Sequence, residues 1–510
     1  MKRILKLIIS LLLISIFLVG CSSANKTTID SSKELVFGTT LKTNSLDPHK
    51  DYAGWFTVRY GVGETLFKLN ESLEEEPLLA KGYNMIDINT WEIFIKDNII
   101  FQNGEALDSN KVKLSLERTL SENSRAKKAL KIDTIESTKN SVIIKTKDPN
   151  PTLIKDLCDP FATIIDVENT EDFNNNPIGT GPFKVGKFNY DKSSYFIKNE
   201  DYWQGKVSLE RLKIIPIEDA DTLSMALQSG EIDAAQGIPY SMMSFFERDD
   251  SYKISTVDTS RVILMYYNFN NDLLKDKNLR KAINMLIDKE SYTNCLLKGS
   301  ASTTLGAFLD VTDFGSRKLN GDTFNKEEGY RLLEESGYKD TDGDGYLDKD
   351  GQKLTFKILT YSSRTELPIL AQAIQASLKE AKIDVTIEVV ENIMDRIALG
   401  DFDLALYSNV TSSTGDPLAY LSYAMKTDGT SNYGNYSNPT IDDLINKLEL
   451  EFNEKSRDEL AIEIQNLALE DSAYNFLAHL KMSFVMKSNV SNLEVHPTDY
   501  YQFTKDTTIE

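Results

Sequence analysis

Strand-like and helix-like segments alternate along most of this 510-residue chain, and no other feature restricts its possible folds so strongly. The clearest case lies at residues 354–390. There "LTFKILTY" and "IDVTIEVV" have the β-branched and apolar residues typical of strands, and "ELPILAQAIQASLKEA" between them has apolar residues at helical spacing. A strand, a helix and a strand in this order predict a βαβ unit with parallel strands. The same alternation elsewhere predicts lobes of mixed α/β structure.

Other segments carry recognisable start and stop signals. "DSNKVKLSLERTL" predicts a helix with Asp108 or Ser109 as its N-cap, and "RLKIIPIED" predicts a strand that leads into a helix ending at Gly230. The length predicts two to four domains. No repeat, low-complexity block or Gly/Pro-rich linker separates them after the N-terminal region, so we expect the chain to cross between domains more than once.

The N-terminus carries a predicted export signal. Its basic start and short apolar run, Leu7 to Val19, are typical of a secretory signal peptide (residues 1–20) rather than of a membrane span. Leu18-Val19-Gly20-Cys21 resembles the lipobox of bacterial lipoproteins, which implies a lipid on Cys21 and a polar tether at residues 21–33. The alternative is an ordinary cleavage site beside a chance cysteine. We therefore predict an extracytoplasmic protein anchored by lipid to the outer face of the cell membrane.

Charge and cysteine content restrict the possible functions further. The formal net charge is −21, and removal of the three cations of the signal segment makes it −24. Such an acidic protein is not expected to bind nucleic acid or to lie flat on an anionic membrane. Besides Cys21 the chain has Cys158 and Cys295, and the sequence leaves open whether they form a disulfide.

The sequence offers no support for an enzyme. Its three histidines, His49, His479 and His496, are not at metal-ligand spacing, and no H-E-x-x-H, G-x-S-x-G, phosphate-binding loop or C-x-x-C occurs. The S-x-x-K at Ser124 to Lys127 is short enough to occur by chance. We therefore predict no catalytic residues, no metal centre and no cofactor.

Several segments instead match one family of binding proteins. Residues 79–112 resemble the signature of the family 5 extracytoplasmic solute-binding proteins of ABC importers, which include oligopeptide-, dipeptide- and nickel-binding proteins. The signature has a strand, a basic residue, an acid and F-x-[ND]-G, seen here from Lys96 to Gly104 with Asn98 in place of the usual acid. Further segments agree in order along nearly the whole chain: "LDPHKDY", "NNPIGTGPFKV", "NEDYWQGKVSLERLKIIPI", "LRKAINMLIDKE", "GDPLAYLSYAM" and "FLAHLKMSFV".

The resemblance implies a bilobal α/β fold of the type II periplasmic-binding-protein (Venus-flytrap) class, with an extra α/β domain inserted in the first lobe. Such proteins close around a ligand in the cleft between the lobes and deliver it to a permease and its ATPase. The expected division is lobe I at residues 34–63, 177–262 and 472–510, the inserted domain at 64–176, and lobe II at 263–471.

One stretch resembles a calcium loop. "DTDGDGYLDKDG", Asp340 to Gly351, has carboxylates at the first, third, fifth and ninth positions of an EF-hand and glycine at the sixth. Its twelfth position is Gly351 instead of the bidentate glutamate, and a strand follows instead of a helix. Weak calcium binding at Asp340–Asp348 is one interpretation, and a solvated loop is the other.

The resemblance also suggests ligand-binding residues. Tyr52 and Trp55 are expected to face the cleft. Peptide-binding members place a carboxylate four residues before the proline of a D/E-P motif, where it meets the peptide ammonium group. Here Ser413 holds that place, and a serine supplies a hydrogen bond but no charge. Asp416 either takes over this role or supports the turn.

Nickel-binding members also lack that acid, and Arg125 lies near an arginine that they use. The histidine and aromatic residues that they bring from the region of the D/E-P motif are missing here, since Thr430 and Gly415 stand about where a histidine and a tyrosine would be. Tyr420 and Tyr433 are expected on the second-lobe side of the cleft.

The leading functional hypothesis is a lipid-anchored, monomeric importer subunit that captures short peptides or peptide-like nutrients. A nickel-chelate binding protein is the alternative within this class. A peptide-sensing receptor is the alternative from another class.

Overall fold

The computed structural model describes residues 33–510. The predicted signal peptide, Cys21 and nearly all of the predicted tether therefore lie outside the described residues. Within residues 33–510, no helix is both long and apolar enough to cross a membrane.

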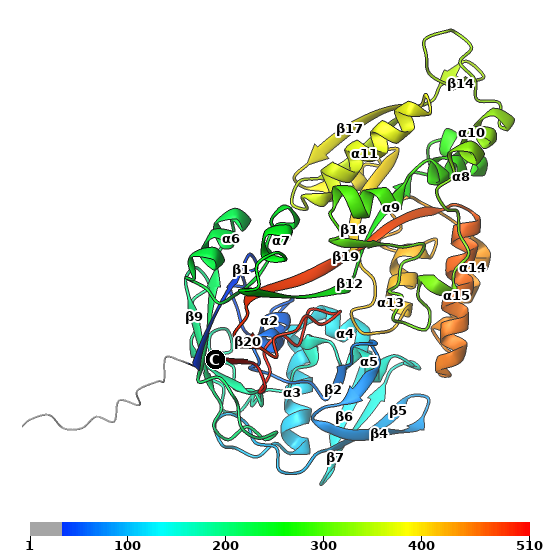
Figure 1. The fold of residues 1–510 in the computed structure, drawn as a ribbon. Coiled ribbons are helices and arrows are strands. Elements are labelled where there is room, and N and C mark those ends of the chain that lie inside the picture. Colours follow the sequence, from blue (N-terminus) through cyan, green and yellow to red (C-terminus); the bar gives the residue numbers. More distant parts are fainter. Residues whose placement is uncertain (1–32) are drawn as a thin grey trace, which may run out of the picture.

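One eleven-stranded sheet extends through most of the molecule (Figure 1). Its strands lie in the order β17 (Asp384–Val390), β16 (Thr355–Tyr361), β18 (Leu404–Val410), β12 (Tyr252–Tyr267), β19 (Tyr474–Lys487), β11 (Ala234–Gln236), β1 (Glu34–Thr39), β10 (Arg211–Pro216), β9 (Ser194–Lys198) and β8 (Phe183–Lys187), with β13 (Ala301–Thr303) paired to β19.

The long antiparallel strands β12 and β19 connect the two halves of this sheet (Figure 1). Their C-terminal ends pair with strands of opposite halves, because residues 484–486 of β19 pair with β11 and residues 261–267 of β12 pair with β18. Their register shifts between Asp258 and Val262, so the ladder is interrupted near its middle. We expect the two halves to move about this interruption.

The predicted local elements are confirmed. Strands β16 and β17 are parallel and are joined by α11 (Glu366–Glu380), which is the expected βαβ unit. Asp108 caps α3 (Ser109–Glu122), since its carboxylate accepts a hydrogen bond of 2.8 Å from the backbone N–H of Lys111. Gly230, with φ of 80°, ends α6 (Ala220–Ser229).

A second, four-stranded antiparallel sheet has its own hydrophobic core. Its order is β4 (Ala80–Asp87), β5 (Thr90–Ile95), β7 (Ser141–Thr146) and β6 (Ile132–Ser137), and α3 and α4 (Ser124–Leu130) pack with it. A small hairpin of β2 (Phe67–Leu69) and β3 (Glu75–Pro77) precedes it. These elements fall within the stretch predicted to be the inserted domain, whose boundaries remain a prediction.

The remaining elements are helices, short turns and short strands. The helices are α2 (Gly54–Arg59), α5 (Leu153–Asp156), α7 (Tyr240–Phe246), α8 (Lys277–Met285), α9 (Lys289–Ser291), α10 (Lys326–Glu335), α12 (Ile393–Ala398), α13 (Leu418–Tyr420), α14 (Pro439–Leu448) and α15 (Glu454–Glu470). Short 3-10 or π turns lie at Pro160–Ala162, Leu273–Lys275, Tyr292–Leu296, Ser316–Lys318 and Leu421–Met425, and short strands are β14 (Asp348–Lys349), β15 (Gln352–Lys353), β20 (Val490–Ser491) and β21 (Thr508–Ile509).

The part with the four-stranded sheet touches the half that contains α14 and α15. The rings of Trp91 and Phe452 are stacked with centroids 6.3 Å apart, and Lys155 Nζ lies 3.4 Å from the carbonyl oxygen of Gly415. A Cβ on Gly415 would lie 2.0 Å from the carbonyl oxygen of Leu73, and its φ is 71°. This contact requires glycine, which explains why no tyrosine stands at position 415.

The two later cysteines do not pair. Cys158 is buried and Cys295 is exposed, and both are free thiols.

Candidate ligand-binding cleft

A cavity of about 550 Å³ opens where β12 and β19 cross between the halves of the sheet. Its walls come from α2, the β11–α7 segment, the start of α11, the end of β18 and residues 497–500. A volume of this size suits a small-molecule ligand.

Aromatic side chains form the wall on the α2 side. Tyr52 and Trp55 meet edge to face with ring centroids 5.0 Å apart, and Trp55 lies 5.9 Å from Tyr500. Tyr52 is 52% exposed, so a ligand can reach its ring. The Trp55 indole N–H is buried without a partner in residues 33–510 and is therefore available to an acceptor on a ligand.

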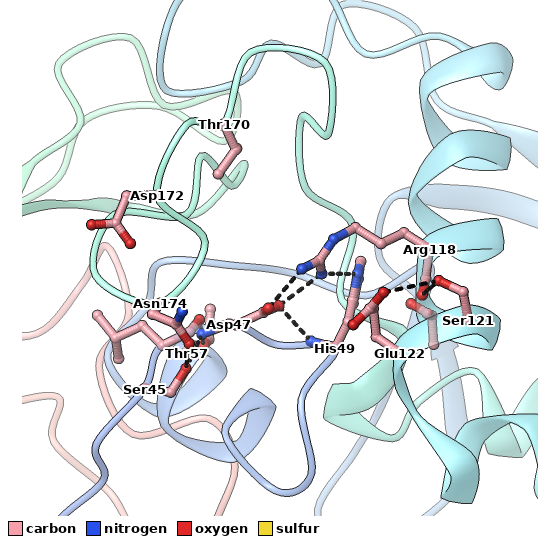
Figure 2. A network of polar contacts seen from close by, with 12 residues as sticks. Ser45, Asp47, His49, Thr57, Arg118, Ser121, Glu122, Thr170, Asp172 and Asn174 are labelled. Atoms are coloured by element: carbon pink, nitrogen blue, oxygen red, sulfur yellow. Dashed lines mark hydrogen bonds and ion pairs between the residues drawn. The ribbon is translucent and has the colours of Figure 1, made fainter.

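A buried polar network holds the loop that carries Tyr52 (Figure 2). Arg118 donates to Asp47 at 2.8 and 2.6 Å and to Nδ1 of His49 at 2.9 Å. Since a guanidinium group can only donate, Nδ1 of His49 accepts, and Nε2 donates to the carbonyl oxygen of Thr163 at 2.9 Å. Burial lowers the pKa of His49 to about 4, and Arg118 acts in the same direction. His49 is thus a neutral structural residue outside the cavity.

Two arginines that are unpaired in the described chain contribute positive charge to the cavity. Arg261 on β12 and Arg364 before α11 both line it, and neither guanidinium group makes an ion pair or hydrogen bond within residues 33–510. Burial lowers the pKa of Arg261 to about 10, and the positive charge of Arg364 contributes. Arg261 therefore remains charged at neutral pH, and with Arg364 it forms a positive site that makes no ion pair among the described residues.

The third arginine of the cavity is already paired. Arg59 forms an ion pair with Asp499, and its Nε donates to the Asp499 carbonyl oxygen at 2.7 Å. The Asp499 carboxylate also accepts from Gln502 at 2.7 Å. Glu366 lines the cavity as well and makes no ion pair in the described part of the chain.

Tyrosines pack together beside β18. The ring of Tyr407 lies 5.6 Å from that of Tyr361 and 5.5 Å from that of Tyr433, which in turn lies 5.4 Å from Tyr266. Burial raises the pKa of Tyr407 to about 12. The Tyr407 hydroxyl is therefore neutral at neutral pH and can both donate and accept a hydrogen bond.

The structure brings only some of the predicted ligand residues to the cavity. Tyr52, Trp55 and Ser413 line it. Arg125 does not, but its guanidinium group lies 4.1 Å from the centre of the Tyr52 ring and pairs with Asp159 at 3.2 Å. Arg125 thus packs against the face of the Tyr52 ring without lining the cavity.

The other predicted residues lie away from the cavity wall. Asp416 is 3% exposed and forms a two-pronged ion pair with Arg457, at 2.6 and 3.2 Å. Tyr420 is fully buried and packs edge to face on Phe308, and Tyr433 belongs to the tyrosine group. The ligand-binding roles of all these residues stay predictions.

Sequence reasoning missed Arg261, Arg364 and Tyr500. Arg261 lies in an otherwise apolar strand pattern, "RVILMYY", and a polar residue there is the one signal that could have identified it. Arg364 stands in a polar turn before α11 and carries no such signal.

The predicted calcium loop has three carboxylates close together. Ligand atoms of Asp340, Asp342 and Asp344 lie within 4.8 Å of one another. Backbone N–H groups of the loop already donate to them, for example from Gly343 to Asp340 at 2.8 Å. The β14–β15 hairpin follows, so a second EF-hand helix is absent from this position.

Comparisons with known proteins agree with this arrangement. Residues 74–432 match the model of the bacterial extracellular solute-binding proteins, family 5. The nickel-binding protein NikA of Staphylococcus aureus is 30% identical over 100% of this chain and 99% of its own. Its structure in complex with Ni(L-His)2 covers 94% of this chain and 100% of its own, with a TM-score of 0.75.

Two further relatives, one named for nickel and one for oligopeptides, also match this chain. The structure of a nickel ABC transporter protein from Bacillus halodurans is 32% identical, covers 94% of this chain and 100% of its own, and has a TM-score of 0.84. The oligopeptide-binding protein AppA of Bacillus subtilis is 25% identical over 99% of this chain and 98% of its own. None of these comparisons lends support to the calcium hypothesis.

The predicted fold class, a bilobal type II binding protein with mixed α/β lobes, is confirmed by these structural relatives. The expectation of a binding protein rather than an enzyme agrees with the family. The chain belongs to the family 5 bacterial extracellular solute-binding proteins.

Proposed function

We propose that this protein is the solute-binding subunit of an ABC importer and that it captures a small solute bearing carboxylate groups, with a nickel chelate as the first candidate. The unpaired guanidinium groups of Arg261 and Arg364 carry this proposal. Two arginines that line one cavity and make no ion pair among the described residues favour an anionic ligand, and guanidinium groups pair particularly well with carboxylates.

The relatives support nickel as the cargo. The two relatives of 30% identity or more described above are named for nickel, and one of them is in complex with Ni(L-His)2. In residues 33–510, no histidine lines the cavity of Arg261 and Arg364. The metal would therefore take its ligands from the chelator, while the protein holds the chelator's carboxylates and covers it with Tyr52 and Trp55.

A short peptide, which is the leading hypothesis from the sequence, is the second candidate. Family membership is compatible with both ligands, because relatives such as AppA are named for peptides. The observation that favours a peptide is Glu366, a carboxylate of the cavity without an ion-pair partner among the described residues. It could hold the α-ammonium group while an arginine holds the α-carboxylate. A peptide-sensing receptor would use the same cleft.

The setting of the protein is part of the proposal. A lipid on Cys21 would hold the protein at the outer face of the cell membrane, and the protein would act as a monomer that docks on a permease with its ATPase. A Cys21→Ser variant that still fractionates with membranes would contradict the lipid anchor.

Calorimetric titration tests the ligand. Mature protein from residue 22 onward is titrated with Ni²⁺ plus L-histidine, Ni²⁺ alone, L-histidine alone and a mixture of short peptides. Arg364→Gln should weaken binding of the preferred ligand by about 10- to 100-fold, because a charge-assisted hydrogen bond contributes about 1.5–3 kcal/mol.

The matched control is Arg331→Gln. Arg331 lies on α10 and pairs with Glu328 and Glu335 on the surface. It should leave the affinity unchanged. Equal affinity of the wild-type protein and Arg364→Gln would overturn the proposed arginine site, and binding of peptides alone would select the second candidate.

A further inference from the structure

A second cavity, of about 470 Å³, lies away from the arginine site. Several parts of the molecule line it: the loop after β2, residues 255–258 of β12 with His479 of β19, and the segment from β13 onward. Residues 494–497 complete it, and Pro497 borders both cavities. Its size suits a small organic molecule.

This cavity has the opposite charge to the first. Glu71, Asp258, Asp310 and Glu494 line it, and no lysine or arginine does. Within residues 33–510, Glu71, Asp258 and Glu494 make no ion pair. One carboxylate oxygen of Asp258 is buried and lacks any hydrogen-bond partner there. Lys481, which is opposite Asp258 in the β-ladder, lines the first cavity instead.

The fourth carboxylate, that of Asp310, has a hydrogen-bond donor and a long ion-pair contact. The backbone N–H of Arg317 donates to Asp310 at 3.0 Å, and the Arg317 side chain is 3.9 Å away and 72% exposed. The cavity as a whole therefore holds several negative charges that nothing in the described chain neutralises.

A buried histidine adds an unsatisfied polar group. His479 is 4% exposed and lies in β19 between Val262 of β12 and Ser302 of β13. Neither ring nitrogen makes a hydrogen bond of normal geometry within residues 33–510, although backbone groups of Phe308 and Thr259 approach the ring. Burial lowers the pKa of His479 to about 4, so the ring is neutral and has one nitrogen that can accept.

We propose that this second cavity binds a small organic cation with two or more ammonium groups, of the diamine and polyamine class. Its carboxylates can each pair with an ammonium group, and the His479 nitrogen and the hydroxyls of Ser302 and Thr303 offer neutral acceptors. Since the cavity is built from several separate parts of the chain, an occupant favours the arrangement in which these parts meet.

The spacing of the groups favours an organic cation over a metal ion. In residues 33–510, only Asp340, Asp342 and Asp344 form a trio of potential metal ligands within 4.8 Å of one another. The acids of the second cavity are more widely spread. A chain of ammonium groups can span such a spread, whereas one metal ion needs its ligands within its own coordination sphere.

Calorimetry with spermidine tests the proposal. The mature protein is titrated in 150 mM NaCl, with butylamine as a probe that has one ammonium group. The test variant is Glu71→Gln/Glu494→Gln, whose two positions are exposed, so folding should be preserved. The control is Asp340→Asn/Asp342→Asn, which removes the same charge from a distant exposed loop. Asp258→Asn separately probes the carboxylate that has one buried oxygen without a partner in the described chain.

We expect saturable binding of one spermidine, weaker by about tenfold or more in Glu71→Gln/Glu494→Gln and unchanged in the control. Butylamine should bind much more weakly. Absence of saturable binding, or equal weakening in test and control variants, would overturn the proposal. The proposal would also be overturned if NiCl2 or CaCl2 displaced spermidine and the same variants weakened that displacement, because the site would then be one for a metal ion. Arg364→Gln should still bind spermidine, so failure here is distinguishable from failure of the proposed import function.

Discussion

The buried ion pair between Asp416 and Arg457 makes it possible to distinguish two roles for Asp416 by experiment, ligand binding and structural support. Arg457 holds both carboxylate oxygens and also donates to the carbonyl oxygens of Leu448 and Glu451, at 2.9 and 2.8 Å. The backbone N–H of Leu418 donates to the same carboxylate at 2.9 Å. The pair therefore fastens the turn before α13 to the start of α15.

The change Asp416→Asn leaves Arg457 buried without a negative partner. Removal of one partner from a buried ion pair costs about 3–5 kcal/mol, and we expect the lower end because the asparagine oxygen can still accept one hydrogen bond. With about 2–4 °C per kcal/mol, Tm should fall by about 6 °C or more. Affinity for the cleft ligand should stay within about twofold, because Asp416 does not line the cavity.

Thermal unfolding and calorimetric titration of the same preparations check both values. Asp428→Asn, a change at an exposed position in the following loop, is the control and should alter neither. An unchanged Tm together with a large loss of affinity would refute the structural role and restore Asp416 as a ligand-binding residue.

Further predictions concern pH and the thiols. Burial raises the pKa of Asp156 to about 7, so the folded protein holds a proton that the unfolded chain loses above its usual pKa of 3.8. This contribution of Asp156 to stability should therefore be lost as pH rises from about 4 to about 7, so the Tm of Asp156→Asn relative to that of the wild-type protein should rise across that range. A thiol reagent should modify Cys295 in the native protein and Cys158 only after unfolding, because Cys158 is buried. Reducing agents should leave Tm unchanged, and a lower Tm would contradict two free thiols.

The sequence was most informative where structure depends on neighbouring residues. The Asp108 cap, the Gly230 stop and the βαβ unit around α11 follow from cap chemistry and residue periodicity within short windows. The family resemblance placed Tyr52 and Trp55 near the cleft in the same way, since both follow a recognisable loop motif.

The sequence was least informative where distant segments meet. Arg261 and Arg364 reach one cavity only because β12 crosses to the second half of the sheet while α11 begins beside it. The partner of Asp416 is on α15, and nothing near either residue indicates the pair. A motif can also assign a segment to a region without fixing the direction of its side chains, as the buried ring of Tyr420 shows.

The central claim is that a carboxylate-bearing chelate occupies the cavity of Arg261 and Arg364. Crystals grown with Ni²⁺ and L-histidine and measured at the nickel absorption edge test it most directly. The account predicts one anomalous peak inside that cavity, with chelator carboxylates against the two guanidinium groups and the Tyr52 and Trp55 rings beside them. A nickel peak at the Asp340–Asp344 loop alone, or a chelate bound away from both arginines, would contradict it.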